Sequence, residues 1–212
     1  MSTTPVDPNS VSLFRDSHLI PEHYWEDLIT LNPSEVVRRG LLPFPFRETY
    51  EIPFLNQIYL CRPSDRRIWR KDRPEKEIHF QEYLVLLMYL TRVKDIPLEG
   101  KKINEREIPG GELFFKGPHA LLKAPLEKKF SRDPQGFVQS GMDLGGIKTE
   151  KGDASFELPV LPRIPVEYIL YLADDEFPAE LLILFDATIH RHLPLDVIWA
   201  MINITSRRLS GK

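Results

Sequence analysis

The chain has 212 residues, of which 42% are hydrophobic and 28% are charged, and its formal net charge is -3. This composition excludes the disordered class and is typical of a globular chain long enough to bury a sizeable core. The small negative charge argues against a protein that mainly coats nucleic acid, because phosphates attract a clustered positive surface. With one cysteine, Cys61, the chain forms no intrachain disulfide, and a thiolate-based zinc or iron–sulfur site needs ligands from another chain. A reducing compartment fits best.

We expect neither a membrane-spanning segment nor an export signal in this sequence. No stretch approaches the roughly 18 apolar residues that cross a bilayer, and the first ten residues (MSTTPVDPNS) lack the basic and apolar segments of a signal peptide. We therefore expect a cytoplasmic protein without an anchor. Residues 1–16 are polar and contain two prolines, so we expect a flexible arm followed by one domain at residues 17–212.

Two short helices are expected at the start of this domain. Pro21 suits a first helical position, and apolar residues recur after it at helical spacing, namely Trp25, Leu28 and Ile29. Asn32 then supplies an N-cap oxygen for a second helix, with a proline and, at the third position, a glutamate behind it. Gly40 is expected to end that helix.

The pattern changes to a period of two after Arg47. Apolar and polar residues alternate on both sides of Asn56, which predicts a β-hairpin. Residues 62–76 contain seven basic and three acidic residues around Trp69, and we expect an exposed strand or loop there. Residues 80–93 (FQEYLVLLMYLTRV) are apolar over nearly the whole circumference of a helix, so this helix is expected at the centre of the core.

Glycines and prolines divide the middle of the chain. The glycine pair at 110–111 predicts a tight turn before an apolar strand, and the Gly-Pro pair at 117–118 predicts the start of a helix bent at Pro125. The Asp-Pro pair at 133–134 predicts the start of another helix, which the glycine pair at 145–146 ends.

The last third predicts a sheet and a helix. Three apolar runs at 155–161, 165–172 and 181–186 are joined by connections too short for helical crossovers, so an antiparallel meander is expected. A final helix at about 195–209 places its apolar residues on one stripe. The predicted fold class is therefore α+β, a single domain with a mainly antiparallel sheet whose C-terminal three-strand meander packs against helices.

Three segments of this sequence carry a resemblance to a known family: IPGGELFFKGPHALL, LPRIPVEYILYLADDEFPAELLILFD and HLPLDVIWAMIN. Together with YLTRVKDIPLEGKKINEREIPGG, they resemble, over about residues 24–210, a family of strictly anaerobic bacteria and archaea that is catalogued only as a domain of unknown function. Some relatives resemble fusions to a small iron–sulfur module of the type found in corrinoid proteins. The resemblance implies anaerobic redox or cofactor biology, with any cluster on a separate partner because this chain lacks the cysteine set. It brings no catalytic residues.

One candidate metal site follows directly after the last predicted strand. Asp186, His190 and His192 lie within FDATIHRHLP, where a rigid sheet edge passes into a turn. Two imidazoles and a carboxylate are ligands for a divalent metal such as zinc or iron. His119 completes the set if its helix packs against this turn. The spacing matches no standard metal motif, so helix capping or a solvent-facing turn remains the structural alternative.

The glycine pair Gly110 and Gly111, with His119, forms a second candidate site, for a cofactor. Glycine lets the backbone approach a ligand closely, although no phosphate-loop pattern surrounds this pair and a tight turn is the alternative. The acidic residues 174–176 offer oxygen ligands but lack the spacing of a calcium loop, so a solvated hairpin turn is favoured. Cys61, between Leu60 and a basic residue, is expected to be a packed thiol.

Three functional hypotheses remain open at this point. The first is an accessory or ligand-binding domain in anaerobic redox or cofactor metabolism, working beside an iron–sulfur or corrinoid protein. The second is a metal-dependent enzyme that uses Asp186, His190 and His192. The third is a docking module in which residues 62–76 bind nucleic acid or an acidic protein, with Trp69 stacking on a base; a salt-bridged surface is its structural alternative.

Overall fold

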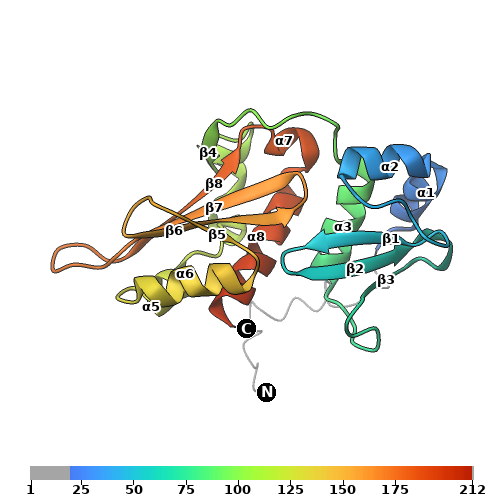
Figure 1. The fold of residues 1–212 in the computed structure, drawn as a ribbon. Helices are drawn as coiled ribbons and strands as arrows, with labels where there is room; N and C mark the ends of the chain where they lie inside the picture. Colours follow the sequence, from blue (N-terminus) through green and yellow to red (C-terminus); the bar gives the residue numbers. More distant parts are fainter. Residues whose placement is uncertain (1–19, 212) are drawn as a thin grey trace, which may run out of the picture.

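The computed structural model describes residues 20–211 and shows an α+β architecture with two antiparallel sheets (Figure 1). The predicted fold class is confirmed, including the three-strand meander near the end of the chain. The arm expected at residues 1–16 lies outside the described residues. No helix in the described part of the chain is long and apolar enough to span a membrane.

The first half of the fold combines a three-stranded sheet with three helices. The strand order is β1-β2-β3, and both pairings are antiparallel. Its elements are α1 (Glu22–Thr30), α2 (Pro33–Gly40), β1 (Tyr50–Phe54), β2 (Gln57–Arg62), the 3-10 turn η3 (Pro63–Asp65), β3 (Arg67–Arg70) and α3 (Phe80–Arg92).

Local side-chain chemistry sets the ends of these helices. The Asn32 side chain accepts a hydrogen bond from the amide of Ser34 at 2.9 Å, which confirms the predicted N-cap of α2. A capping box starts α3, because the His79 ring accepts from the amide of Gln81 while the Glu82 carboxylate accepts from the amide of His79. These caps satisfy amides that a helix start leaves without partners.

The second half contains a five-stranded sheet in the order β4-β8-β7-β6-β5, with every pair antiparallel. The β7–β8 hairpin extends well beyond the rest of the sheet (Figure 1). Its elements are β4 (Lys102–Asn104), α4 (Gly111–Phe114), the 3-10 turn η4 (Gly117–His119), α5 (Ala124–Phe130), α6 (Pro134–Asp143), β5 (Ile147–Thr149), β6 (Ala154–Leu161), β7 (Ile164–Tyr171), β8 (Glu180–Asp186), α7 (Ile189–His192) and α8 (Leu195–Ser210).

One continuous hydrophobic core runs through both halves. Helices α3 and α8 pack against each other at the centre, α1 and α2 pack on α3, and α5 and α6 cover β8 and β6 (Figure 1). The prediction that residues 80–93 form a central helix is confirmed, since most of α3 is buried. A helix that is apolar on all sides needs such cover, because apolar surface left in water loses roughly 25 cal/mol of stabilisation per Å².

Arg163, in the turn between β6 and β7, ties the two halves together. Its guanidinium donates to the backbone carbonyls of Arg38 and Arg39 at the end of α2, and to that of Ile96 at 3.1 Å. It also pairs with Asp95. The carbonyls at a helix end carry partial negative charge, so the mostly buried guanidinium of Arg163 adds favourable donors at the end of α2.

Four expectations from the sequence are corrected by this structure. The apolar run after the glycine pair 110–111 forms α4 rather than a strand, and Leu113 within it is 83% exposed. The helix expected from residue 117 is one 3-10 turn, and Pro125 opens the separate helix α5 instead of bending a longer one. The short strands β4 and β5 were not predicted. Ile29 is 52% exposed and lines an apolar hollow of about 410 Å³ together with Phe44.

Candidate functional site

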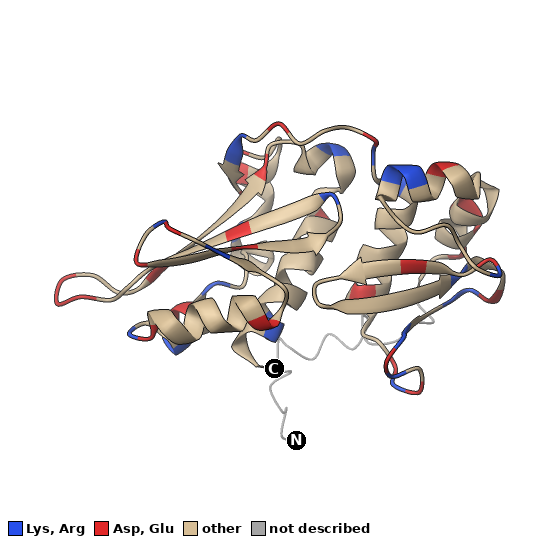
Figure 2. Ribbon diagram, viewed as in Figure 1, with Lys and Arg blue, Asp and Glu red and all other residues tan. Residues whose placement is uncertain are grey.

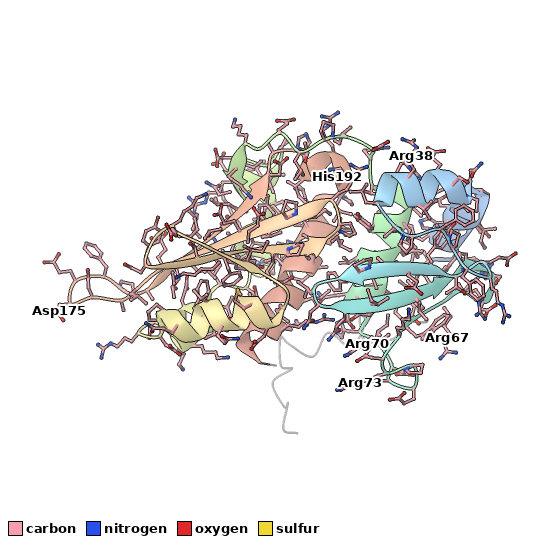
Figure 3. All side chains as sticks on the ribbon, viewed as in Figure 1. Arg38, Arg67, Arg70, Arg73, Asp175 and His192 are labelled. Carbon is pink, nitrogen blue, oxygen red and sulfur yellow. The ribbon has the colours of Figure 1, made fainter. Side chains whose placement is uncertain are left out.

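The turn that carries Asp186, His190 and His192 lies at the boundary between the two halves. Strand β8 ends at Asp186, and the one-turn helix α7 then leads into α8. Figure 3 places His192 beneath α7, facing the first half, and Asp175 at the far tip of the β7–β8 hairpin. The segment that joins α3 to β4, residues 94–101, passes over this turn (Figure 1).

Asp186 is a buried carboxylate that organises this turn and the passing segment. It accepts hydrogen bonds from the amides of Glu99 at 3.1 Å and Gly100 at 2.7 Å, and from both the amide and the hydroxyl of Thr188. Burial by itself raises the pKa of Asp186, but the hydrogen bonds from Thr188, Glu99 and Gly100 outweigh burial and hold this pKa below its usual range. Asp186 therefore acts as an anionic acceptor that fixes two segments of backbone.

His192 is 2% exposed and holds the start of the same segment. Its Nδ1 accepts from the amide of Lys94 at 3.3 Å, so in the neutral ring the proton lies on Nε2. That Nε2 is buried and has no hydrogen-bond partner among residues 20–211. Burial, reinforced by the positive charges of Arg163 and Arg191, lowers the pKa of His192 to about 4. The ring is therefore neutral at pH 7 and presents one buried, unused donor.

The other two predicted metal ligands are exposed rather than buried. His190 is exposed on α7, and His119 is exposed on η4, where its ring stacks on Phe114 at 4.7 Å and meets the edge of Trp199 at 5.6 Å. Within residues 20–211, no three histidine, cysteine, aspartate or glutamate side chains are arranged to hold a metal ion. The metal site thus gains no geometric support and stays a prediction from sequence.

A pocket of about 390 Å³ lies beside His192, between the end of α3 and the stretch from α7 to α8. Its inner wall is formed by the buried residues Met88, His192 and Leu193. Its exposed rim consists of Arg92, Lys94, His190, Arg191 and Pro194. Figure 2 shows basic positions on α2 and α7 along this same edge of the molecule. The volume falls in the range of about 300 to 1,000 Å³ that is typical of small-molecule sites.

Gly110 and Gly111, the predicted cofactor residues, serve local structure. Gly110 adopts a left-handed conformation with φ of +79° at the start of α4. Gly111 donates its amide to the carbonyl of Ile108 at 2.7 Å, and a Cβ at Gly111 would collide with the carbonyl oxygen of Glu105. The amide of Gly111 is thus already used, and both positions require glycine for the turn itself.

The basic segment 62–76 is largely neutralised by its surroundings. Five of its basic residues form ion pairs, with the pairs Arg62–Asp65, Arg66–Glu22, Arg70–Asp72, Lys71–Glu51 and Arg73–Asp72. Arg62 and Arg67 also lie over the ring of Trp69, which leaves this ring less open to a base. This arrangement matches the salt-bridged alternative rather than a nucleic-acid surface.

Two further sequence interpretations agree with the structure. Cys61 is fully buried in β2, and burial raises the pKa of its thiol, so it behaves as a packed side chain. At the tip of the β7–β8 hairpin, Asp174 accepts from the amides of Glu176 and Phe177 at 2.8 and 2.7 Å. Such a turn closed by an aspartate side chain needs no cation.

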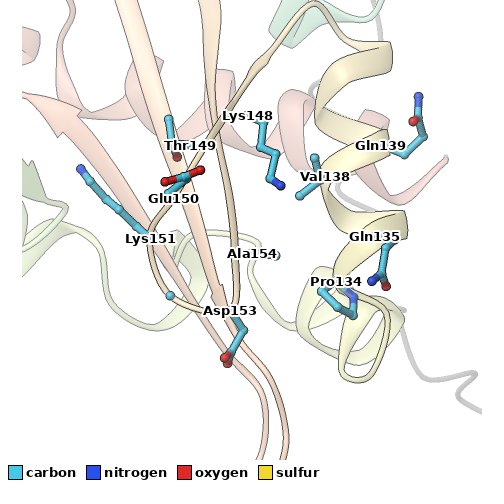
Figure 4. A pocket seen from close by; sticks show the side chains of 11 residues that line it. Pro134, Gln135, Val138, Gln139, Lys148, Thr149, Glu150, Lys151, Asp153 and Ala154 are labelled. Carbon is cyan, nitrogen blue, oxygen red and sulfur yellow. The ribbon is translucent and has the colours of Figure 1, made fainter.

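A cleft of about 450 Å³, larger than the pocket at His192, separates α6 from the β5–β6 hairpin (Figure 4). Lys148 extends across it toward α6, whereas Lys151 points away from it and pairs with the buried Glu167 at 2.9 Å. Its lining carries both charges, with Glu150 and Asp153 beside the lysines. Charges of both signs on an exposed hairpin are common on protein surfaces, so this cleft gives a weaker argument than the pocket at His192.

Of the residues that line the pocket, the sequence pointed only to His190 and His192. Met88, Arg92 and Lys94 lie nearly one hundred positions before His192, at the end of the central helix α3 and just after it, and their sequence gives no local sign of a pocket. Arg163, which lowers the pKa of His192, is likewise distant in sequence. Only the packing of α7 against the end of α3 brings these groups together.

Comparison with known proteins places the chain in a family. No significant match appears among curated proteins, and none appears among solved structures. The model of one family, described as a domain of unknown function (DUF3786), matches residues 32–208. This range includes α3, α7 and nearly all of α8, and therefore the whole pocket. The chain belongs to the DUF3786 family.

Proposed function

We propose that this chain is an accessory domain that binds a small ligand in the pocket between α3 and α7. The observation that carries the proposal is the buried Nε2 of His192, which has no partner in residues 20–211 and belongs to a side chain that lines the pocket. A buried donor without a partner costs about 1 to 3 kcal/mol, and a ligand that accepts its proton recovers this free energy. A functional site is one place where a fold retains such a cost, and seven further buried side-chain atoms of residues 20–211 also lack a partner.

The context of the proposed domain is anaerobic redox or cofactor metabolism, beside an iron–sulfur or corrinoid protein. The support is the resemblance to a family in which some members look like fusions to an iron–sulfur module. Cys61 is buried and is the chain's single cysteine, so a cluster belongs to the partner in this proposal. The domain then supplies a ligand site and a surface, and the partner supplies the electron-transfer chemistry.

Nuclear magnetic resonance with a fragment library tests the ligand site. The library contains neutral, cationic and anionic compounds, and the measured signals are the backbone amides of residues 88–94 and 189–193. We expect some compounds to shift these amides and to leave unchanged the amides of residues 148–154, which line the cleft at α6. If no compound of any charge shifts the signals around His192, the pocket is not a ligand site.

Purification from a native anaerobic host tests the second part of the proposal. We expect the chain to be recovered with a partner whose absorption spectrum shows an iron–sulfur cluster or a corrinoid. Recovery of the chain alone, colourless and without a bound small molecule, contradicts the role beside such a partner.

A further inference from the structure

The rim of the His192 pocket is positively charged. Arg92, Lys94 and Arg191 are exposed there, and no acidic side chain of residues 20–211 lines the pocket. Two of these side chains form long, exposed ion pairs: Nη2 of Arg92 lies 3.7 Å from a carboxylate oxygen of Asp27, and Nη1 of Arg191 lies 3.8 Å from one of Glu99. Exposed pairs of this length contribute at most a fraction of a kcal/mol, so the arginines remain available to a ligand.

The inner wall adds a donor and an apolar surface. The neutral imidazole of His192 carries an Nε2–H that has no partner and almost no accessible surface, so a ligand reaches it only when the wall shifts slightly, whereas Met88 and Leu193 offer buried apolar atoms. Lys94 joins wall and rim, because its amide holds Nδ1 of His192 while its side chain lines the pocket. A cationic ligand would meet three like charges and a donor, and an uncharged ligand would leave the three charges unused.

We propose that the ligand of this pocket is a small organic anion. Its carboxylate or similar oxyanion group accepts the proton of His192 Nε2 and is attracted by Arg92, Lys94 and Arg191, and its apolar part lies on Met88 and Leu193. This inference rests on the proposed function, since it names the ligand class of the same pocket. Hydrogen bonds in which one partner is charged are about twice as strong as neutral ones, and burial at the inner wall protects this bond from water.

Matched probes separate charge from shape in a test of this proposal. Hexanoate, hexanamide and hexylammonium each contain a linear chain of six carbons and differ in charge, and inorganic phosphate tests whether the oxyanion alone is sufficient. Each is titrated into full-length protein with the amide of Lys94 and the ring nitrogens of His192 as signals. We expect hexanoate to bind with a dissociation constant on the order of 1 mM, as suits a fragment, and the amide and ammonium to bind about tenfold more weakly.

Variants of the chain complete the experiment. The double variant Arg92→Gln and Lys94→Gln changes exposed side chains, and we expect it to weaken hexanoate binding about fivefold. His192→Asn retains an acceptor for the amide of Lys94 but lacks the ring donor, and we expect about a tenfold loss. Lys148→Gln, an exposed lysine in the cleft at α6, is the matched control and leaves the affinity unchanged.

The outcomes distinguish this inference from the proposed function. Equal binding of all three alkyl probes overturns the anion class, while the pocket remains a ligand site. Binding of hexanoate that survives both the rim variant and His192→Asn overturns the assignment to these residues. Failure of hexanoate and phosphate at 20-fold above the expected dissociation constant overturns the inference, and the fragment library then shows separately whether the pocket accepts any ligand.

Discussion

The buried imidazole of His192 predicts a specific loss of stability in mild acid. Its pKa in the folded chain is about 4, against an ordinary value of 6.5. Between these values the unfolded chain binds more protons than the folded chain, so the free energy of unfolding falls as the pH decreases. The contribution is complete above pH 6.5. Lowering the pH from 7 to 5 removes about 2 kcal/mol, and the loss approaches about 3 kcal/mol near pH 4.

The groups around His192 support this direction. Burial is the main cause, Arg163, Arg191 and His190 oppose a further positive charge, and Asp186 favours it to a smaller extent. Because Asp186 is already engaged by four donors, it has little capacity to rescue a protonated ring. The neutral ring is therefore the form that the folded chain requires.

Urea unfolding at pH 7, 6 and 5, at constant ionic strength and followed by tryptophan fluorescence, measures this effect. The variant His192→Asn keeps an acceptor for the amide of Lys94 but does not titrate in this range. The contributions of the other histidines cancel when the pH slope of the variant is subtracted from that of the natural chain. If both chains lose the same stability between pH 7 and pH 5, the reasoning about His192 is refuted.

Two further substitutions probe the turn and the glycine pair, both through urea midpoints. Asp186→Asn removes the negative charge that accepts from four donors, and we expect it to lower the free energy of unfolding by about 2 to 4 kcal/mol. The control Asp175→Asn, at the exposed hairpin tip, should change it by less than about 0.5 kcal/mol. Equal midpoints for the two variants would contradict the role of Asp186. Gly111→Ala places a Cβ against the carbonyl of Glu105 and should lower the free energy of unfolding by more than about 2 kcal/mol. Gly117→Ala, at φ of +56° and with no neighbouring atom near the new Cβ, should lower it by about 1 kcal/mol. The reverse order would be inconsistent with the collision at Gly111.

The sequence predicted those elements whose signals are local. The cap at Asn32, the apolar circumference of residues 80–93 and the three apolar runs of the meander each depend on neighbours within one element, and the structure confirms them. Strands β4 and β5 have three residues each, too few to show a period, and exist because a longer strand offers its edge. The four-residue helix α4 was mistaken for a strand for the same reason of length.

The site was predictable only in part. Asp186 and His192 stood out because they follow the last strand, and both are buried there, but as acceptors of backbone amides. Residue type and spacing do not reveal whether a carboxylate will meet amides or a metal. The amides come from residues 94–101, and the basic rim comes from the end of α3 and from α7, so the site depends on a tertiary contact that no single segment encodes.

The pairing of α3 with α8 has a consequence for how the chain is made. Helix α3 is complete in sequence at Arg92, but α8 begins only at Leu195, about one hundred residues later. During synthesis, the apolar helix α3 therefore leaves the ribosome long before α8, which packs against it. Until then, Leu86 and Leu90, which are fully buried in the folded chain, must be shielded by transient collapse or by a chaperone. The part of the core between α3 and α8 can therefore form only after α8 has been synthesised.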